Sequence, residues 1–467
     1  MSMDQKQQKD TFEIGIIGMG DMGRLYARSF YQSGWTRINV CDLPEKTASL
    51  RAEFPQYNVF ENGHLVSRRS DLIIYSVEAK YIASVVAAFG PSTKLNAIVS
   101  GQTSVKAPEV AAFEQHLPDD VHIIPVHSMH GPNVSPVGQP LVMVQHRASD
   151  AAYAHAQSVY ESLGSKVVHL TAKEHDRITA DTQAATHLAF KSMGTAWMAQ
   201  TSFPWEDLNY VGGVDNVKVA MTLRIYSAKW HVYAGLALLN PAARAQIAQY
   251  AKSVDGLFSL MIRERADEFR ARVHRAVDFV FNGEKAVAER KRRGLLLADA
   301  LLDEYTLSSG SAASAAAAVA AFTADDAAST KTLPGSPRSA KRNSHLSLLA
   351  MVDCWHALTT NPYEHLIVQT PPFRLWLGIV EYLCCTPGLL DAAIDAAIYE
   401  KDVRADDLAF VAATNGWAQT ILQGHFDSYQ ARFEHTQAFF SERLEQGRQV
   451  SARIIETLGK NMRARGE

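Results

Sequence analysis

The amino-acid sequence predicts an α/β protein, in which an N-terminal parallel sheet is followed by a mainly α-helical region. Two observations lead to this fold class. In residues 13–23, EIGIIGMGDMG, a short apolar run leads into three glycines with the spacing of a dinucleotide-binding loop. Near residue 171, alternating strand and helix signals give way to long amphipathic stretches. The first region is therefore predicted to be a Rossmann-type sheet.

The glycine loop is the most informative segment, because each glycine has its own physical reason. Gly18 permits the tight turn, Gly20 lets a pyrophosphate approach the backbone, and Gly23 lets the next helix pack on the strand. The first turn of that helix offers unpaired N–H groups to phosphate. The alternative is a glycine-rich turn in another α/β fold. The predicted cofactor-binding loop consists of Gly18, Met19, Gly20, Asp21, Met22 and Gly23.

Strand and helix signals continue to alternate after this loop. Asp42 closes the second strand about 20 residues beyond the glycines, where an acid usually binds the adenosine ribose hydroxyls. Ser76 and Val77, at the end of a later strand, complete the predicted cofactor site. The expected strands are 14–17, 38–41, a weak one near 59, 72–77, 97–99, 121–126, 141–144 and 167–170, and the expected helices are 21–33, 45–54, 79–89 and 151–163.

Strand signals nearly vanish beyond residue 173. Long stretches with helical spacing occupy residues 178–197, 217–239, 242–282 and 345–359. We therefore divide the chain into a dinucleotide-binding domain, residues 1–171, and a helical domain for substrate and dimer contact, residues 172–467. Residues 308–340 are rich in Ala, Ser, Gly and Pro, which predicts a disordered insertion.

Composition narrows the function classes. The 467 residues are 47% hydrophobic and carry a formal net charge of −3, which disfavours nucleic acid as a partner. The basic residues 290–293 are interpreted as a solvated helix end. No apolar run of about 18 residues predicts a membrane span, and the polar N-terminus does not resemble a secretory signal. We expect a cytoplasmic protein without a metal site, because neither the four cysteines nor the histidines have metal-ligand spacing.

Three polar clusters follow strands of the expected sheet, where ligands of parallel sheets bind. His127, in the last of these clusters, suits a general base facing a nicotinamide, and the alternative is that it only caps its loop. Ser104 either positions a substrate hydroxyl or caps a helix that begins near residue 107. His130 is interpreted as a loop residue. The clusters are Ser76 with Glu78, residues 102–106 and residues 127–131.

Two residues of the helical region are further candidates. Arg224 lies between apolar residues on an expected helix, where an unpaired guanidinium is costly. A substrate carboxylate would satisfy it, as would a structural ion pair with a protein carboxylate. His187 also lies among apolar residues, either as a ligand of the site or as a core histidine.

The chain resembles the prephenate dehydrogenases of tyrosine biosynthesis, especially their fungal branch, over most of its length outside the N-terminal tail and residues 308–340. This resemblance implies oxidative decarboxylation of prephenate to 4-hydroxyphenylpyruvate, with hydride transfer to a nicotinamide. The segments that carry it are GIIGMGDMGRLYA, NGHLVSRRSDLIIYSVEA, GQTSVKAPE, VHSMHGP, EHDRITADTQAATHLAF, LRIYSAKWHVYAGLALLNP and NSHLSLLA.

The resemblance also implies roles for individual residues. His127 looks like the catalytic base, in a motif with Ser128 where bacterial members commonly have Pro. Ser104 is similar to the serine that orients this histidine and the substrate hydroxyl. Arg224 matches an arginine that binds a substrate carboxylate, and His187 matches a histidine of the same pocket. Lys106 and Lys229 are weaker candidates for anion contact.

The cofactor and the substrate each leave an alternative. Asp42 favours NAD, since a carboxylate repels a 2′-phosphate, whereas the fungal branch implies NADP, with Arg24 and Lys46 as candidate phosphate partners. We expect NADP, with NAD as the alternative. Alternative functions are an arogenate or β-hydroxy-acid dehydrogenase and a non-catalytic dinucleotide-sensing protein. The resemblance also implies a homodimer formed through the helical domain.

Overall fold

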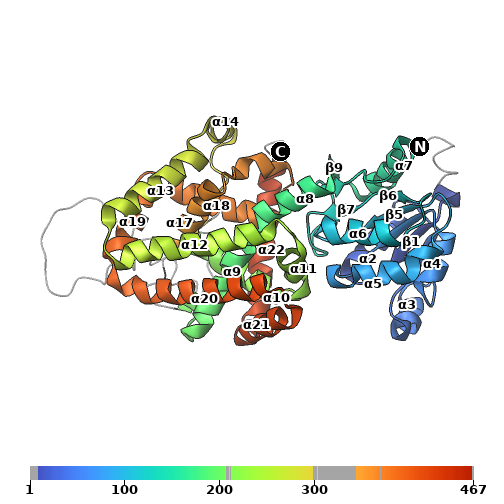
Figure 1. Ribbon diagram of the computed structural model, residues 1–467, viewed down its shortest axis with the longest axis horizontal. Coiled ribbons are helices and arrows are strands. Elements are labelled where there is room, and N and C mark those ends of the chain that lie inside the picture. Colours follow the sequence, from blue (N-terminus) through green and yellow to red (C-terminus); the bar gives the residue numbers. More distant parts are fainter. Residues whose placement is uncertain are drawn as a thin grey trace, which may run out of the picture.

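The computed structural model describes residues 9–206, 210, 212–297, 302, 343–368 and 370–464. The chain forms two parts that lie side by side along its long axis (Figure 1). A sheet flanked by helices makes up the N-terminal part, and helix α8, Ala172–Thr179, leads from it into the helical part. The predicted disordered insertion, residues 308–340, lies outside the described residues.

The N-terminal part is built on a six-stranded parallel sheet, which confirms the predicted fold class. Its strand order is β3-β2-β1-β4-β5-β6, so the order reverses between β1 and β4. Ligands of such sheets bind beyond the carboxyl ends of the strands at this reversal. The strands are β1 Ile14–Ile17, β2 Ile38–Cys41, β3 Asn58–Val59, β4 Leu72–Tyr75, β5 Ile98–Gly101 and β6 His122–Ile123.

Helices cover both faces of this sheet. On one face, Tyr26, Phe30 and Tyr160 pack with the side chains of β1 and β2 that point the same way. On the other face, Val86 and Phe113 pack against the remaining strand side chains. Burial of apolar side chains on both faces explains why the strands read as continuous apolar runs. The helices are α2 Asp21–Gln32, α3 Thr47–Glu53, α4 Gly63–Arg69, α5 Ile82–Phe89, α6 Lys106–His116 and α7 Asp150–Tyr160.

The single strand predicted for residues 121–126 is wrong. The structure divides it into β6, which pairs with β5, and β7, Val126–Ser128, which pairs antiparallel with β8, Pro140–Met143. Pro125 lies between them and has no N–H for the ladder, so the first sheet ends there. A parallel partner of β8, β9 Lys166–His169, completes a second, three-stranded sheet. The polar cluster 127–131 therefore belongs to this second sheet.

The helical part encloses the largest apolar core. A π-helical turn, Ala180–Ala184, joins α8 to α9 without a break, so residues 172–199 form one long helical segment. The predicted helix 242–282 is broken at Glu264, whose φ of 55° cannot continue a helix. The predicted helix 217–239 is also broken, at residues 228–230. The remaining helices are α9 Ala185–Ala199, α10 Val214–Ser227, α11 His231–Leu239, α12 Ala243–Ile262, α13 Ala266–Phe281, α14 Glu284–Arg293, α17 Leu346–Ala357, α18 Pro371–Cys385, α19 Leu389–Tyr399, α20 Arg404–Gln423, α21 Phe426–Phe439 and α22 Leu444–Ala464.

The two parts share side chains across their boundary. Val105, in the loop between β5 and α6, is buried in the core of the helical part. A small apolar cluster joins Met129 and Val142 of the second sheet to Val368 of the helical part. These contacts fix the helical part against the carboxyl ends of the strands, where the site is expected.

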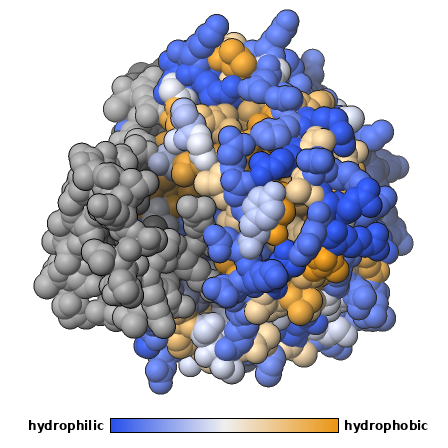
Figure 2. Space-filling view, turned by 90° about the vertical axis from the view of Figure 1, so that its left-hand side faces the viewer, coloured by the Kyte–Doolittle hydropathy of each residue, from blue (hydrophilic) through white to orange (hydrophobic). Residues whose placement is uncertain are grey.

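The outer surface has no pattern typical of a membrane protein. Figure 2 looks at the end of the helical part, where the coloured surface is mostly hydrophilic with scattered hydrophobic patches. Within the described residues, no single helix has the length and apolar composition to cross a bilayer, and only α18 and α19 together, bent by 88°, reach that composition.

Two glycines of α22 provide a matched test of its packing on α10. A Cβ on Gly447 would lie 2.3 Å from Cβ of Leu223, whereas a Cβ on Gly459 meets nothing within 4 Å. We predict that G447A lowers the thermal midpoint, because overpacking costs about 1–3 kcal/mol against a helix-propensity gain of about 0.5–1 kcal/mol. G459A should raise it through that gain alone. Calorimetry measures both variants, and a G447A protein as stable as G459A would contradict this packing.

Candidate active site

The glycine loop leaves room for a ligand beside the backbone at one of its three glycines. Gly18 has a φ of 100°, and a Cβ there would lie 2.4 Å from the carbonyl oxygen of Ser76. A Cβ on Gly23 would lie 2.1 Å from the carbonyl oxygen of Gly18, whereas one on Gly20 meets no protein atom within 4 Å. No side chain caps the N-terminus of α2 at Gly20. These features fit the pyrophosphate of a dinucleotide.

Charged side chains surround the adenosine end of this loop. The Asp42 carboxylate accepts hydrogen bonds from the backbone N–H of Met19 at 2.9 Å and of Leu43 at 2.7 Å. Lys46 pairs with the same carboxylate at 3.2 Å. Arg24 donates to the carbonyl oxygen of Met19 at 2.8 Å and also pairs with Glu53. Asp42 thus ties the end of β2 to the glycine loop, and both candidate phosphate partners lie next to that loop.

Each polar cluster at the strand ends contains a buried atom without a hydrogen-bond partner in the described part of the chain. Ser76 donates to Oε1 of Gln102 at 2.8 Å, which joins the ends of β4 and β5. Nε2 of Gln102, Oε2 of Glu78 and Nε2 of His130 remain without a hydrogen bond. Buried polar atoms are normally satisfied, so unsatisfied ones at this edge of the sheet fit a ligand-binding region.

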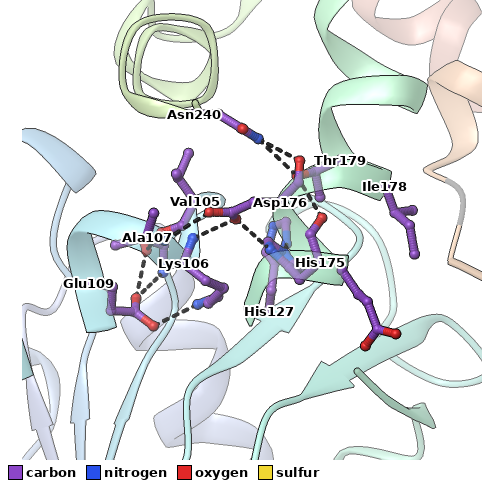
Figure 3. A network of polar contacts seen from close by, with 12 residues as sticks. Val105, Lys106, Ala107, Glu109, His127, His175, Asp176, Ile178, Thr179 and Asn240 are labelled. Atoms are coloured by element: carbon purple, nitrogen blue, oxygen red, sulfur yellow. Dashed lines mark hydrogen bonds and ion pairs between the residues drawn. The ribbon is translucent and has the colours of Figure 1, made fainter. Parts of the chain in front are cut away.

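His127 lies at one end of a buried hydrogen-bonded chain (Figure 3). Its Nδ1 is 2.8 Å from Nε2 of His175, and Nδ1 of His175 is 2.9 Å from Oδ1 of Asp176. His127 comes from β7, whereas the other two residues come from α8 at the start of the helical part. Burial, with the charge of Lys106 and the two neighbouring histidines, holds the pKa of His127 well below its usual range. His127 is therefore a neutral imidazole at neutral pH.

Asp176 also caps helix α6. Its two carboxylate oxygens accept the backbone N–H groups of Lys106 at 2.7 Å and Ala107 at 2.8 Å. The N-cap position itself is Val105, whose side chain makes no capping hydrogen bond. Ser104 is therefore not needed as the cap, which was one of its two interpretations. Within the described residues no hydrogen bond is found between Ser104 and His127.

Lys106 is wholly buried and cannot contact a ligand, so the weak prediction that it binds an anion is wrong. Its ammonium donates to Oε1 of Glu109 and to the carbonyl oxygen of Val126, both at 2.7 Å, and to that of Gly101 at 3.3 Å. These three acceptors use all of its N–H donors. Burial lowers the pKa of Lys106, and the Glu109 carboxylate opposes that shift. Because Val126 precedes His127, this ammonium anchors the strand that carries the histidine.

Lys229, the other weak candidate for anion contact, is exposed and pairs with Asp21 of the glycine loop at 3.2 Å. The neighbouring His231, at the start of α11, lies 3.3 Å from Glu78. A Cβ on Gly235 would lie 3.0 Å from Ala79, so the same helix packs closely on the turn after β4. These contacts place α11 beside the cofactor edge of the sheet.

The two predicted substrate residues of the helical part meet at Tyr233. The ring of His187 packs edge-on against Tyr233 with centroids 4.8 Å apart. Burial raises the pKa of Tyr233 to about 12, and the nearby charge of Arg224 opposes that shift. Arg224 is half-buried, and no carboxylate of the described residues forms an ion pair with it. Burial lowers the pKa of His187 to about 3, so it too is neutral at neutral pH.

Comparison with known families accounts for both parts of the chain. A family described as a "6-phosphogluconate dehydrogenase C-terminal domain", of a type named after a tyrosine-biosynthesis enzyme, matches residues 184–460. A second, "NADP oxidoreductase coenzyme F420-dependent", matches residues 13–101, which contain the glycine loop.

Two fungal relatives match almost the whole chain. A probable prephenate dehydrogenase [NADP(+)] of Schizosaccharomyces pombe is 48% identical, with 97% of this chain and 99% of the relative covered. A prephenate dehydrogenase [NADP(+)] of Saccharomyces cerevisiae is 46% identical, with 97% and 95% covered. The chain belongs to the prephenate dehydrogenase family. A solved prephenate dehydrogenase of A. aeolicus, in complex with hydroxyphenyl propionate and NAD+, is 20% identical with a TM-score of 0.46, and the match covers 56% of this chain and 94% of that one.

Sequence reasoning missed several residues of this prephenate dehydrogenase site. His175 and Asp176 are adjacent in the segment EHDRITADTQAATHLAF, which was assigned to the family resemblance without roles of their own. Glu109 looks like the partner of an ordinary surface pair at i and i+3. Tyr233 had no distinguishing signal. Among the described residues, no group of three or more His, Cys, Asp or Glu side chains could hold a metal ion.

Proposed function

We propose that this chain is an NADP-dependent prephenate dehydrogenase, which converts prephenate to 4-hydroxyphenylpyruvate and CO2 in tyrosine biosynthesis. The observation that carries the proposal is the 46–48% identity to fungal proteins of that name over 97% of the chain. This range includes the glycine loop, His127 and Arg224. The hydrogen-bonded environment of His127 supports the same chemistry.

The substrate's chemistry defines what the site must supply. Prephenate has a ring hydroxyl on a non-aromatic diene and two carboxylates. Loss of the hydroxyl proton and of the hydride on the same carbon lets the ring carboxylate leave as CO2, and aromatisation drives the step. The bound nicotinamide is the hydride acceptor. The protein must therefore provide a proton acceptor at the hydroxyl and cations at the carboxylates.

His127 is the proposed proton acceptor. It is neutral because burial lowers its pKa, so a ring nitrogen can accept the hydroxyl proton at neutral pH. Protonation in acid would remove that capacity, so kcat/KM should fall only as the pH drops through this lowered pKa. Ser104, which the helix cap does not require, is proposed to orient the substrate hydroxyl.

Arg224 is the proposed partner of a substrate carboxylate, with His187 in the same pocket. A half-buried guanidinium without a protein carboxylate is costly, and a bound carboxylate would remove that cost. Tyr233 lies between the two residues and would form a wall of the pocket.

The glycine loop, Asp42, Ser76 and Val77 are proposed to hold the dinucleotide. The open side of Gly20 and the uncapped N-terminus of α2 support pyrophosphate binding. NADP follows from the names of the fungal relatives. Arg24 and Lys46 are the proposed cations for the 2′-phosphate, and each would exchange its present carboxylate partner for it.

The organisation of the molecule is part of the proposal. We propose a dinucleotide-binding domain of residues 1–171 and a helical domain of residues 172–467, with homodimer contacts through the helical domain and a cytoplasmic location. The start of α8 at Ala172 supports this boundary.

A cofactor-by-substrate matrix tests the function directly. We predict that NADP with prephenate gives the highest kcat/KM, with reduced nicotinamide and 4-hydroxyphenylpyruvate formed in equal amounts. NAD should be less effective, and so should arogenate, whose side chain is alanyl instead of pyruvyl. Absorbance and product chromatography measure the four combinations. Absence of turnover in all four would refute the proposal, and faster turnover of arogenate would make it an arogenate dehydrogenase.

Replacement of Arg224 tests the carboxylate site. We predict that R224A raises KM for prephenate by about 10- to 100-fold, since a hydrogen bond to a charged group contributes about 1.5–3 kcal/mol. The KM for NADP should not change. R270A is the control, because Arg270 forms an exposed pair with Asp395 far along the helical part. Initial-rate kinetics decide, and an unchanged prephenate KM in R224A would contradict this role.

A further inference from the structure

The buried chain formed by Asp176, His175 and His127 carries an inference about how the base is prepared (Figure 3). We propose that His175 and Asp176 are positioning residues, which fix the proton of His127 on Nδ1 and leave its Nε2 as the proton acceptor. This inference rests on the proposed function, in which His127 accepts the substrate proton. It assigns work to two α8 residues that make no proposed contact with substrate.

The direction of the chain is set at Asp176. Its oxygens accept the backbone N–H groups of Lys106 and Ala107 at 2.7 and 2.8 Å. The N-terminus of α6 stabilises the negative charge, and an ionised carboxylate only accepts hydrogen bonds. Nδ1 of His175, 2.9 Å from Oδ1 of Asp176, must therefore be the donor.

His175 passes this direction on. It is fully buried, and burial together with Lys106 lowers its pKa, although Asp176 opposes the shift. A neutral imidazole with its proton on Nδ1 can only accept at Nε2. The 2.8 Å contact between Nε2 of His175 and Nδ1 of His127 is then a hydrogen bond donated by His127. Nε2 of His127 is left with its lone pair.

The charged and titratable groups around His127 agree with this arrangement. His175 faces it from α8, Lys106 from α6 and His130 from the loop after β7, and each disfavours its protonation. When Nε2 accepts the substrate proton, the imidazolium still donates from Nδ1 to His175. Because His175 is bonded to Asp176, the new positive charge is connected to a carboxylate, as in other acid–histidine pairs.

Loss of His175 should therefore affect the tautomer of His127 as well as its environment. Without an acceptor for Nδ1–H, part of the population would carry the proton on Nε2 and could not accept another. This loss does not depend on protonation in acid. It should therefore persist on the alkaline side of the pH profile, whereas a purely electrostatic effect of a charged His175 should disappear there.

Two substitutions of His175 separate these effects. We predict that H175L lowers kcat by at least about 10-fold, within the range seen when a supporting residue of a histidine is lost, with the loss retained at alkaline pH. H175Q should recover most of the activity, because its amide can accept from His127 and donate to Asp176. NADP affinity, from fluorescence titration, should remain within about twofold of the wild type in both. Should H175L not fold, H175N replaces it, since its shorter amide cannot reach both neighbours.

H365L provides the matched control. His365 is also buried and lies 3.2 Å from Oδ2 of Asp181, in the π-turn after α8. Its loss should lower the thermal midpoint while kcat stays near that of the wild type. The inference is overturned if H175Q is as impaired as H175L, if the loss disappears at alkaline pH, or if H365L loses kcat equally. A wild-type protein without turnover would instead refute the proposed function.

Discussion

The carboxylate of Asp176 is the interaction on which the arrangement of the site depends. It stands at the start of the helical part, yet it accepts the first backbone N–H groups of α6 from the sheet part and the ring N–H of His175. Asn240 donates to the backbone carbonyl oxygen of Asp176 at 2.8 Å, so α8 is held from the other side as well. One carboxylate therefore fixes the join between the two parts and orients the histidine proposed as the base. Any change that moves α8 relative to α6 would also move His127.

The buried pair of Lys106 and Glu109 extends this arrangement to the backbone of His127. Both side chains are fully buried, and the carboxylate accepts from Thr103 as well as from Lys106. Burying such a pair contributes little net stability, because desolvation offsets most of the attraction. Its geometric effect is more specific. By holding the carbonyl oxygen of Val126, Lys106 sets the position of β7, and Asp176 sets the ring of the next residue through His175. The site is thus defined by polar contacts that are almost completely satisfied.

The sequence predicted those features that leave a local pattern. The glycine spacing, the apolar strands and the placement of His127 beyond a strand are all short-range signals, and the structure agrees with the α/β class. Pro125 was a signal for the break between β6 and β7 that the apolar run obscured. Asp176 could not be recognised as the cap of α6, because the residues it joins lie 70 positions apart. Lys106 and Glu109 have the spacing of a solvated helix pair, and only tertiary packing buries them.

The central claim is that His127 presents an unprotonated Nε2 at neutral pH. Nitrogen-15 NMR of the ring nitrogens measures this directly in protein labelled at histidine, with the His127 signals assigned by their absence in H127N. The account predicts a protonated Nδ1 and a non-protonated Nε2, with a hydrogen-bonded proton on Nδ1. A His127 that carries its proton on Nε2, or that is an imidazolium at neutral pH, would contradict it.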